Sequence, residues 1–159
     1  MPGARNNKQV VSWALYDWAN SAFATTVMAA FFPVFFKEYW NSGADIEHST
    51  FQLGLANSFS SLVVVFLAPL LGAIADQGGP RRKFLIAFAF LGILATGCLY
   101  LVSEGAWILA VFVYALAAVG FSGANTFYDS LLVAVADREQ SDFVSALGYS
   151  LGYLGGGLL

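Results

Sequence analysis

Two groups of polar side chains lie inside strongly apolar stretches of this 159-residue chain. The groups are Asp17, Asn20 and Ser21 in the first stretch, and Asn125, Tyr128 and Asp129 in the fourth. Each group falls at helical spacing, so its members share one face of a helix. Acidic groups at membrane depth are costly and usually face a bundle interior or an aqueous cavity. The two groups therefore predict a path for a polar solute towards one side of the membrane.

A plainer interpretation of the two acids is that both are interfacial. Asp17 would then stabilise helix contacts near the membrane edge, and Asp129 would lie where the fourth helix enters a loop. Asn57, Ser60 and Ser61 form a similar polar stripe in the second stretch. Hydrogen bonds from serine to its own helix explain that stripe about as well as a solute path does.

Conventional catalytic groups are scarce in the sequence. His48 is the single histidine, and Cys98 is the single cysteine, so no cluster with zinc-ligand spacing and no serine–histidine–acid arrangement is present. An intramembrane aspartyl hydrolase would need Asp17 and Asp129 at one depth, and neither falls near the bilayer centre. We therefore expect no enzyme activity, no cofactor and no metal.

The apolar stretches that carry these groups are long enough to cross a bilayer. Hydrophobic residues make up 58% of the chain and charged residues 11%, with a mean hydropathy of +0.69; an average soluble domain has about 25% charged residues. A spanning helix needs about 20 apolar residues. The sequence therefore predicts an all-α, polytopic transmembrane helix bundle with spans at about 10–36, 51–75, 84–103, 105–128 and 143–159. A net charge of −3 argues against a nucleic-acid partner.

Basic residues are distributed unevenly between the two sides of the predicted bundle. One side carries Arg5, Lys8, Arg81, Arg82, Lys83 and Arg138, and the other carries Lys37. Because loops rich in lysine and arginine stay in the cytoplasm, the N-terminus is predicted to be cytoplasmic.

The loop between the second and third spans holds the most specific local motif. Gly72 is followed after three residues by Asp76, after two more by Gly79, and after one more by the pair Arg81-Arg82. This spacing resembles the cytoplasmic signature of major facilitator transporters. The resemblance implies that these five residues form a latch that holds one conformation of the transporter. Any short basic loop of a membrane protein is the plainer alternative.

Two further strings resemble one branch of that superfamily. They are residues 12–24, in the first span, and residues 127–132, in the fourth. The branch contains the fungal autophagy-related vacuolar amino-acid effluxers and many bacterial relatives. In the fifth span, Gly148 and Gly152 are similar to an antiporter-type glycine motif, but Tyr153 stands where that motif has proline. We therefore infer no antiport from this span.

The resemblance implies a fold and a mechanism. The chain would be an N-terminal fragment containing about five helices of the N-terminal six-helix half of a major facilitator fold. The whole protein would be a secondary active transporter that moves a small polar solute, with amino acids as candidates, by alternating access. Its partners would be the solute, a coupling proton, the lipid bilayer and the C-terminal half of the same transporter.

The alternative function is that of a non-transporting membrane scaffold or receptor-like partner built from the same helices. Either function places the chain in the membrane as a multi-pass protein. We expect a bacterial inner (plasma) membrane, or a vacuolar membrane for a fungal protein. Further spans beyond Leu159, with a second basic loop, would favour the transporter over the scaffold.

Overall fold

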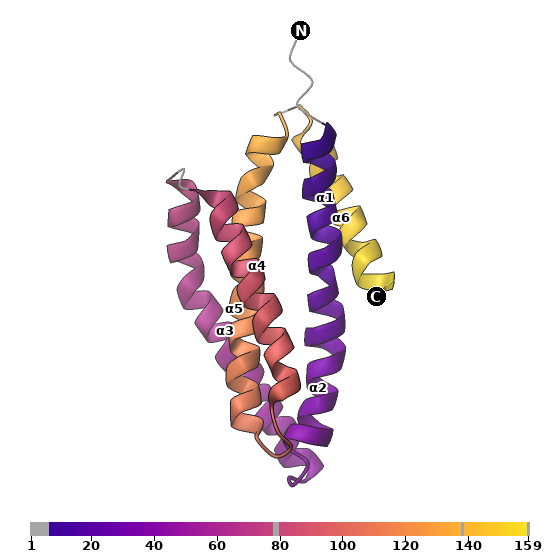
Figure 1. Cartoon of the computed structure of the whole chain (residues 1–159), viewed down its shortest axis with the longest axis vertical. Coiled ribbons are helices and arrows are strands. Elements are labelled where there is room, and N and C mark those ends of the chain that lie inside the picture. Colours follow the sequence, from indigo (N-terminus) through magenta and orange to yellow (C-terminus); the bar gives the residue numbers. More distant parts are fainter. Residues whose placement is uncertain (1–6, 78–79, 138, 159) are drawn as a thin grey trace.

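The computed structural model describes residues 7–77, 80–137 and 139–158, and these residues are helical apart from short connections (Figure 1). The first helical rod consists of α1 (Asn7–Ala22), η1 (Phe23–Phe31), α2 (Phe32–Phe35) and η2 (Phe36–Trp40). The remaining elements are α3 (Ile46–Asp76), α4 (Arg81–Cys98), η3 (Leu99–Leu101), α5 (Trp107–Val135) and α6 (Ser141–Leu158). No strand occurs in this part of the chain, which confirms the predicted all-α class.

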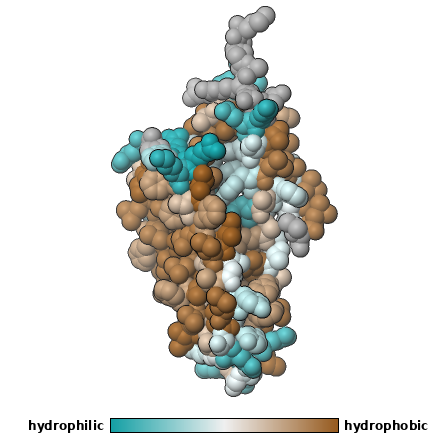
Figure 2. Space-filling view, viewed as in Figure 1, coloured by the Kyte–Doolittle hydropathy of each residue, from teal (hydrophilic) through white to brown (hydrophobic). Residues whose placement is uncertain are grey.

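Four helices are long and apolar enough to cross a membrane. They cover Lys8–Trp40, Ile46–Asp76, Arg81–Leu101 and Trp107–Val135. Figure 2 shows the matching surface, on which a broad apolar band separates two hydrophilic ends. Helix α6 has 18 residues and is not among the four, since its glycines, serines and tyrosines dilute its apolar character. A fifth span at 143–159 therefore stays a prediction.

Two helices run beyond the predicted apolar stretches. Helix α3 begins at Ile46, because Asp45 caps it: the Asp45 carboxylate accepts a hydrogen bond of 2.7 Å from the backbone N–H of His48. Helix α5 continues past Tyr128 to Val135. Asp129 therefore lies within the helix rather than at its junction with a loop.

The first rod is not a regular α-helix along its whole length. The segments Phe23–Phe31 and Phe36–Trp40 are wound as π-helix, and Pro33 lies in the short α-helical turn between them. Proline has no backbone N–H to donate, so the regular hydrogen-bond ladder cannot pass through this point unchanged.

Glycines set the closest helix contacts. A Cβ atom built on Gly120 of α5 would collide with the backbone of Gly92 in α4 and would lie 2.9 Å from the Phe88 carbonyl oxygen. Helix α6 lies against α1 in the same way, through Gly148, Gly152 and Gly155. The helices therefore pack as two close groups, α1 with α6 and α5 with both α3 and α4 (Figure 1).

An aromatic cluster joins these two groups at the end of the molecule opposite the N-terminus. The Phe32 ring stacks on Tyr114 of α5, with 3.7 Å between ring centroids. Nearby, the Trp40 indole N–H donates a hydrogen bond of 3.2 Å to the Val102 carbonyl oxygen. Phe32, Trp40 and Tyr114 are all buried, so this cluster forms the core at that end.

Candidate functional site

Helices α1, α5 and α6 meet in the half of the molecule that contains the N-terminus. There the Asn20 side-chain amide donates a hydrogen bond of 2.6 Å to the Asn125 side-chain oxygen. The pair is partly buried and joins α1 to α5 across 105 residues of sequence. The structure thus brings together one residue from each of the two predicted polar groups.

Tyr128 lies one helical turn from this pair, between two aromatic rings of α1. Its ring centroid is 4.3 Å from that of Trp13 and 5.1 Å from that of Tyr16, and both pairs are stacked. The Trp13 indole N–H donates a hydrogen bond of 3.1 Å to the Tyr128 carbonyl oxygen. Trp13 and Tyr16 were not among the predicted site residues, although Tyr16 falls four residues before Asn20 on the same helix face.

Two hydroxyl groups of this aromatic stack are buried without a partner. The side-chain oxygens of Tyr16 and Tyr128 accept and donate no hydrogen bond within the described residues. A buried hydroxyl without a partner is costly, and such groups are rare in folded proteins. The α1–α5 junction therefore has unused hydrogen-bonding capacity.

Asp17 and Ser21 face α6 instead of α5. A Cβ atom built on Gly152 would lie 2.6 Å from a carboxylate oxygen of Asp17 and 2.9 Å from the Ser21 hydroxyl oxygen. The reason is helical phase: residues 17 and 21 point about 40° apart, whereas residues 20 and 21 point about 100° apart. The first span was predicted to have a single polar face. It has two: Asn20 contacts α5, and Asp17 and Ser21 contact α6.

Asp129 is exposed on the surface of α5, beside the buried Tyr128. Asp17 is half-buried on α1, at the contact with Gly152 of α6. The junction of α1, α5 and α6 thus carries two acidic groups, one half-buried and one exposed.

Arg81 is the residue of the predicted latch loop that makes contacts within the described structure. Its Nε–H donates a hydrogen bond of 2.7 Å to the Ala75 carbonyl oxygen, and one terminal N–H donates at 3.0 Å to the Ser130 carbonyl oxygen. The guanidinium thereby ties the C-terminal end of α3 and the N-terminal end of α4 to α5, directly beside Asp129.

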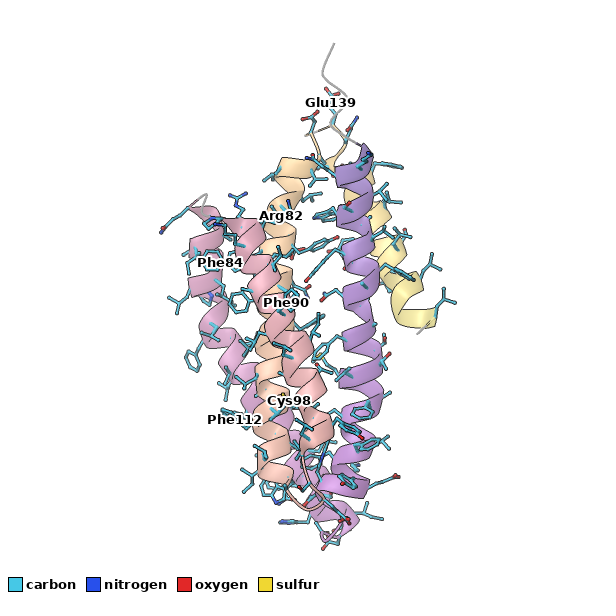
Figure 3. All side chains as sticks on the ribbon, in the orientation of Figure 1. Arg82, Phe84, Phe90, Cys98, Phe112 and Glu139 are labelled. Atoms are coloured by element: carbon cyan, nitrogen blue, oxygen red, sulfur yellow. The ribbon has the colours of Figure 1, made fainter. Side chains whose placement is uncertain are left out.

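The other residues of the loop are more open. Asp76 is the last residue of α3 and is exposed. Arg82, near the start of α4, is exposed as well (Figure 3). Gly72 lies within α3, and a Cβ atom built on it would contact nothing within 4 Å. Gly79 lies outside the described residues. The loop thus presents Asp76 and Arg82 at the molecular surface, and Arg82 lies in the same half of the molecule as Glu139 (Figure 3).

A cavity of about 510 Å³ opens between the first helical rod, α4 and α5. Its walls are mostly apolar, and Tyr16 and Asn20 supply polar groups on the α1 side. Of the predicted path residues, Asn20 is the one that lines this cavity. Asp17 and Asp129 do not line it, so the two carboxylates lie outside this cavity.

The chain matches a known protein family over most of its length. Residues 3–159 match the family model described as Major Facilitator Superfamily. The chain belongs to this superfamily. Its members are transporters, so the prediction that the chain is not an enzyme is confirmed. Family membership, together with four apolar helices, identifies an integral, multi-pass membrane protein.

Three relatives are similar to this chain, and one of them is named for the superfamily and another for the predicted branch. An uncharacterized MFS-type transporter, YxiO of Bacillus subtilis, is 42% identical over 152 residues, which cover 95% of this chain and 36% of YxiO. An uncharacterized protein of Aquifex aeolicus is 30% identical over 95% of this chain and 37% of its own length. Autophagy-related protein 22 of Coccidioides immitis is 22% identical over 86% of this chain and 30% of its own length.

The chain thus spans about a third of the length of these relatives. No solved structure matches it. The resemblance to the superfamily and to its autophagy-related branch, inferred from residues 12–24, 72–83 and 127–132, is confirmed by the family model and by these relatives.

Proposed function

We propose that the chain is part of a secondary active transporter that moves a small polar solute across the membrane by alternating access. The observation that carries this proposal is the Asn20–Asn125 hydrogen bond between two membrane-crossing helices of a major facilitator protein. Polar groups in such helices are rare, and they commonly mark substrate or ion pathways. We assign the path to Asp17, Asn20, Ser21, Asn125, Tyr128 and Asp129.

The mechanism needs a contact that holds one conformation, and we assign it to the loop of Gly72, Asp76, Gly79, Arg81 and Arg82. The role of Arg81 in this proposal is to fix the ends of α3 and α4 against α5. Asp76 and Arg82, which are exposed, would then meet the C-terminal half of the transporter when the two halves close on that side. Opening of that side would break these contacts.

Amino acids are the candidate substrates, because the chain resembles the autophagy-related effluxers. The two carboxylates at the α1–α5–α6 junction, Asp17 and Asp129, are candidate sites for a coupling proton. For the orientation we propose a cytoplasmic N-terminus, on the basic-residue count alone. The bacterial sources of two of the three relatives favour the inner membrane of a bacterium over a vacuolar membrane.

The test is transport by the full-length protein reconstituted into liposomes, with an amino-acid mixture inside and mass-spectrometric detection of efflux. We expect Asp17→Asn and Asp76→Asn each to slow transport at least several-fold. The control is Glu47→Gln, which removes an exposed acid in the first turn of α3 and should leave transport unchanged. Normal transport by both aspartate variants would overturn the assigned roles.

A wild-type protein that moves none of the tested solutes would instead favour the scaffold or receptor-like alternative. The two results are separable, because one concerns the aspartate variants and the other concerns the unaltered protein.

A further inference from the structure

The first helical rod is wound differently in its middle from its start. At the end of the π-wound segment Phe23–Phe31, the backbone N–H of Phe32 donates a hydrogen bond to the Val27 carbonyl oxygen, five residues back. An α-helix bonds four residues back. Segments with five-residue bonds are rare and usually last a single turn, and they are among the few places where helices bend sharply. The rod therefore has a bending point between its two ends.

The part of the rod before this segment is packed on α6. A Cβ atom built on Gly148 of α6 would collide with the Trp13 ring, and one built on Gly155 would collide with the Trp18 backbone. Because only glycine fits at these two contacts, α1 and α6 lie directly against each other. The two helices therefore form one unit.

The part of the rod after the segment is packed on other helices. Phe32 stacks on Tyr114 of α5. Just past the end of the rod, the Asn41 side-chain amide donates a hydrogen bond of 3.1 Å to the Ser49 hydroxyl oxygen of α3, and both residues are buried. This end of the rod is therefore fixed to α3 and α5. The π-wound segment connects it to the α1–α6 unit.

A separate set of contacts, which we call the clasp, joins the α1–α6 unit to α5. It consists of Trp13, Tyr16 and Asn20 of α1 with Asn125 and Tyr128 of α5. Two hydrogen bonds hold it closed, from Trp13 to Tyr128 and from Asn20 to Asn125. These contacts are the part of the α1–α5 junction that must separate if the rod bends.

The closed clasp is not fully satisfied. The hydroxyl oxygens of Tyr16 and Tyr128 have no hydrogen-bond partner within the described residues, although these residues already enclose them. Another segment of the full-length protein cannot reach an enclosed oxygen unless the helices move apart. Because an unpaired buried hydroxyl is costly, the closed clasp carries a cost that opening removes. Two hydrogen bonds thus favour the closed clasp, and two unpaired hydroxyls oppose it.

We propose that the π-wound segment Phe23–Phe31 is a hinge at which α1 and α6 swing together relative to α3, α4 and α5, and that the clasp holds this hinge closed. The hinge is a property of the fold and goes beyond the proposed transport function. Opening separates Asn20 from Asn125 and so widens the assigned solute path; that consequence alone rests on the proposed function.

The first experiment measures whether the rod bends in the full-length protein in lipid nanodiscs. Spin labels are attached to Val11→Cys and Val34→Cys, two exposed positions on either side of the π-wound segment, in a cysteine-free background that includes Cys98→Ser. The matched control pair is Phe112→Cys with Val133→Cys, which are exposed on the continuous α-helix α5. Electron–electron double resonance should give two distances for the rod pair and one distance, near 32 Å by helical rise (roughly 1.5 Å per residue), for the control pair.

The second experiment shifts the balance between the two rod distances. Asn20→Ala removes a hydrogen bond of the clasp and should raise the ratio of the open to the closed form about 3-fold. Tyr128→Phe removes an unpaired buried hydroxyl and should lower the same ratio about 5-fold. The matched control for the second variant is Tyr153→Phe, since Tyr153 is exposed on α6 and lies outside the clasp. Its ratio should be that of the wild type.

A single rod distance, as narrow as that of α5 in the wild type and in both clasp variants, would overturn the hinge. Two rod distances whose ratio neither clasp variant changes would overturn the role of the clasp. The measurements need no solute. A full-length protein that shows the predicted shifts and transports nothing would therefore support the hinge while refuting the proposed function.

Discussion

The amide pair Asn20–Asn125 is the best-defined polar contact between α1 and α5. Hydrogen bonds between membrane helices contribute about 0.6 kcal/mol on average and up to about 1.7 kcal/mol. A double-mutant cycle with Asn20→Ala and Asn125→Ala in the full-length protein should therefore give a coupling energy of about 0.6–1.7 kcal/mol in the free energy of unfolding. A cycle of Asn20→Ala with Asn57→Ala should give none, and an equal coupling in both cycles would contradict this role.

Arg81 offers a second test of a single side chain. Its guanidinium donates to the carbonyl oxygens of Ala75 and Ser130 at once, whereas a lysine ammonium is a compact point charge that cannot reproduce this fork. Arg81→Lys should therefore lower the free energy of unfolding by about 0.5–1.5 kcal/mol, the value of one lost hydrogen bond. The neighbouring, exposed Arg82→Lys is the control and should unfold like the wild type, as followed by thermal denaturation in detergent.

Among the helices, α4 and α5 cross where Gly92 meets Gly120. Gly120→Ala places a methyl group against the Gly92 backbone, so the two helices must separate or shift. Overpacking of this kind costs about 1–3 kcal/mol. We expect a lower melting temperature for Gly120→Ala, and little change for Gly97→Ala, because a Cβ atom at Gly97 of α4 meets nothing within 4 Å. Equal melting temperatures would show that this crossing is not tight.

The contact of α6 with α1 allows a rescue experiment. Gly152→Ala places a methyl group 2.6 Å from a carboxylate oxygen of Asp17, so the variant should be less stable than the wild type. Shortening the opposing side chain with Asp17→Ala should restore part of that stability, whereas Gly157→Ala, with nothing near its Cβ position, should need no rescue. An Asp17→Ala change that makes Gly152→Ala worse would argue against this contact.

At the scale of the whole molecule, the start of α1, the start of α4 and the end of α5 lie at one end, and residues 41–45 lie at the other (Figure 1). The orientation can be read with cysteines in a Cys98→Ser background of the full-length protein. Ser42→Cys should react with a membrane-impermeant maleimide in intact cells. Arg82→Cys should react only after the membrane is opened, because basic loops stay in the cytoplasm. The reverse pattern would invert the orientation.

Much of this protein could be predicted from local properties of its sequence. Hydropathy and charge spacing are properties of contiguous residues, so they were enough to predict an all-α chain with apolar, membrane-length helices, four of which the structure contains within the described residues. The motif of residues 72–83 is local too, and it led to the superfamily that the family model confirms. Helix ends were less predictable from hydropathy. The second span was predicted to begin at residue 51, whereas the Asp45 cap starts α3 at Ile46, in a polar stretch.

The site could not be predicted to the same degree, since it depends on helix phase and on contacts far apart in sequence. Spacing placed Asp17, Asn20 and Ser21 on one face, but the helices packed around α1 send Asn20 to α5 and the other two to α6. The sequence by itself thus determined that the chain is a membrane protein, that it is helical and which superfamily it belongs to. These three properties follow from runs of neighbouring residues. Only the tertiary structure decided that Asn20 meets Asn125 while Asp17 and Ser21 meet Gly152, because each contact joins helices that the chain order keeps apart.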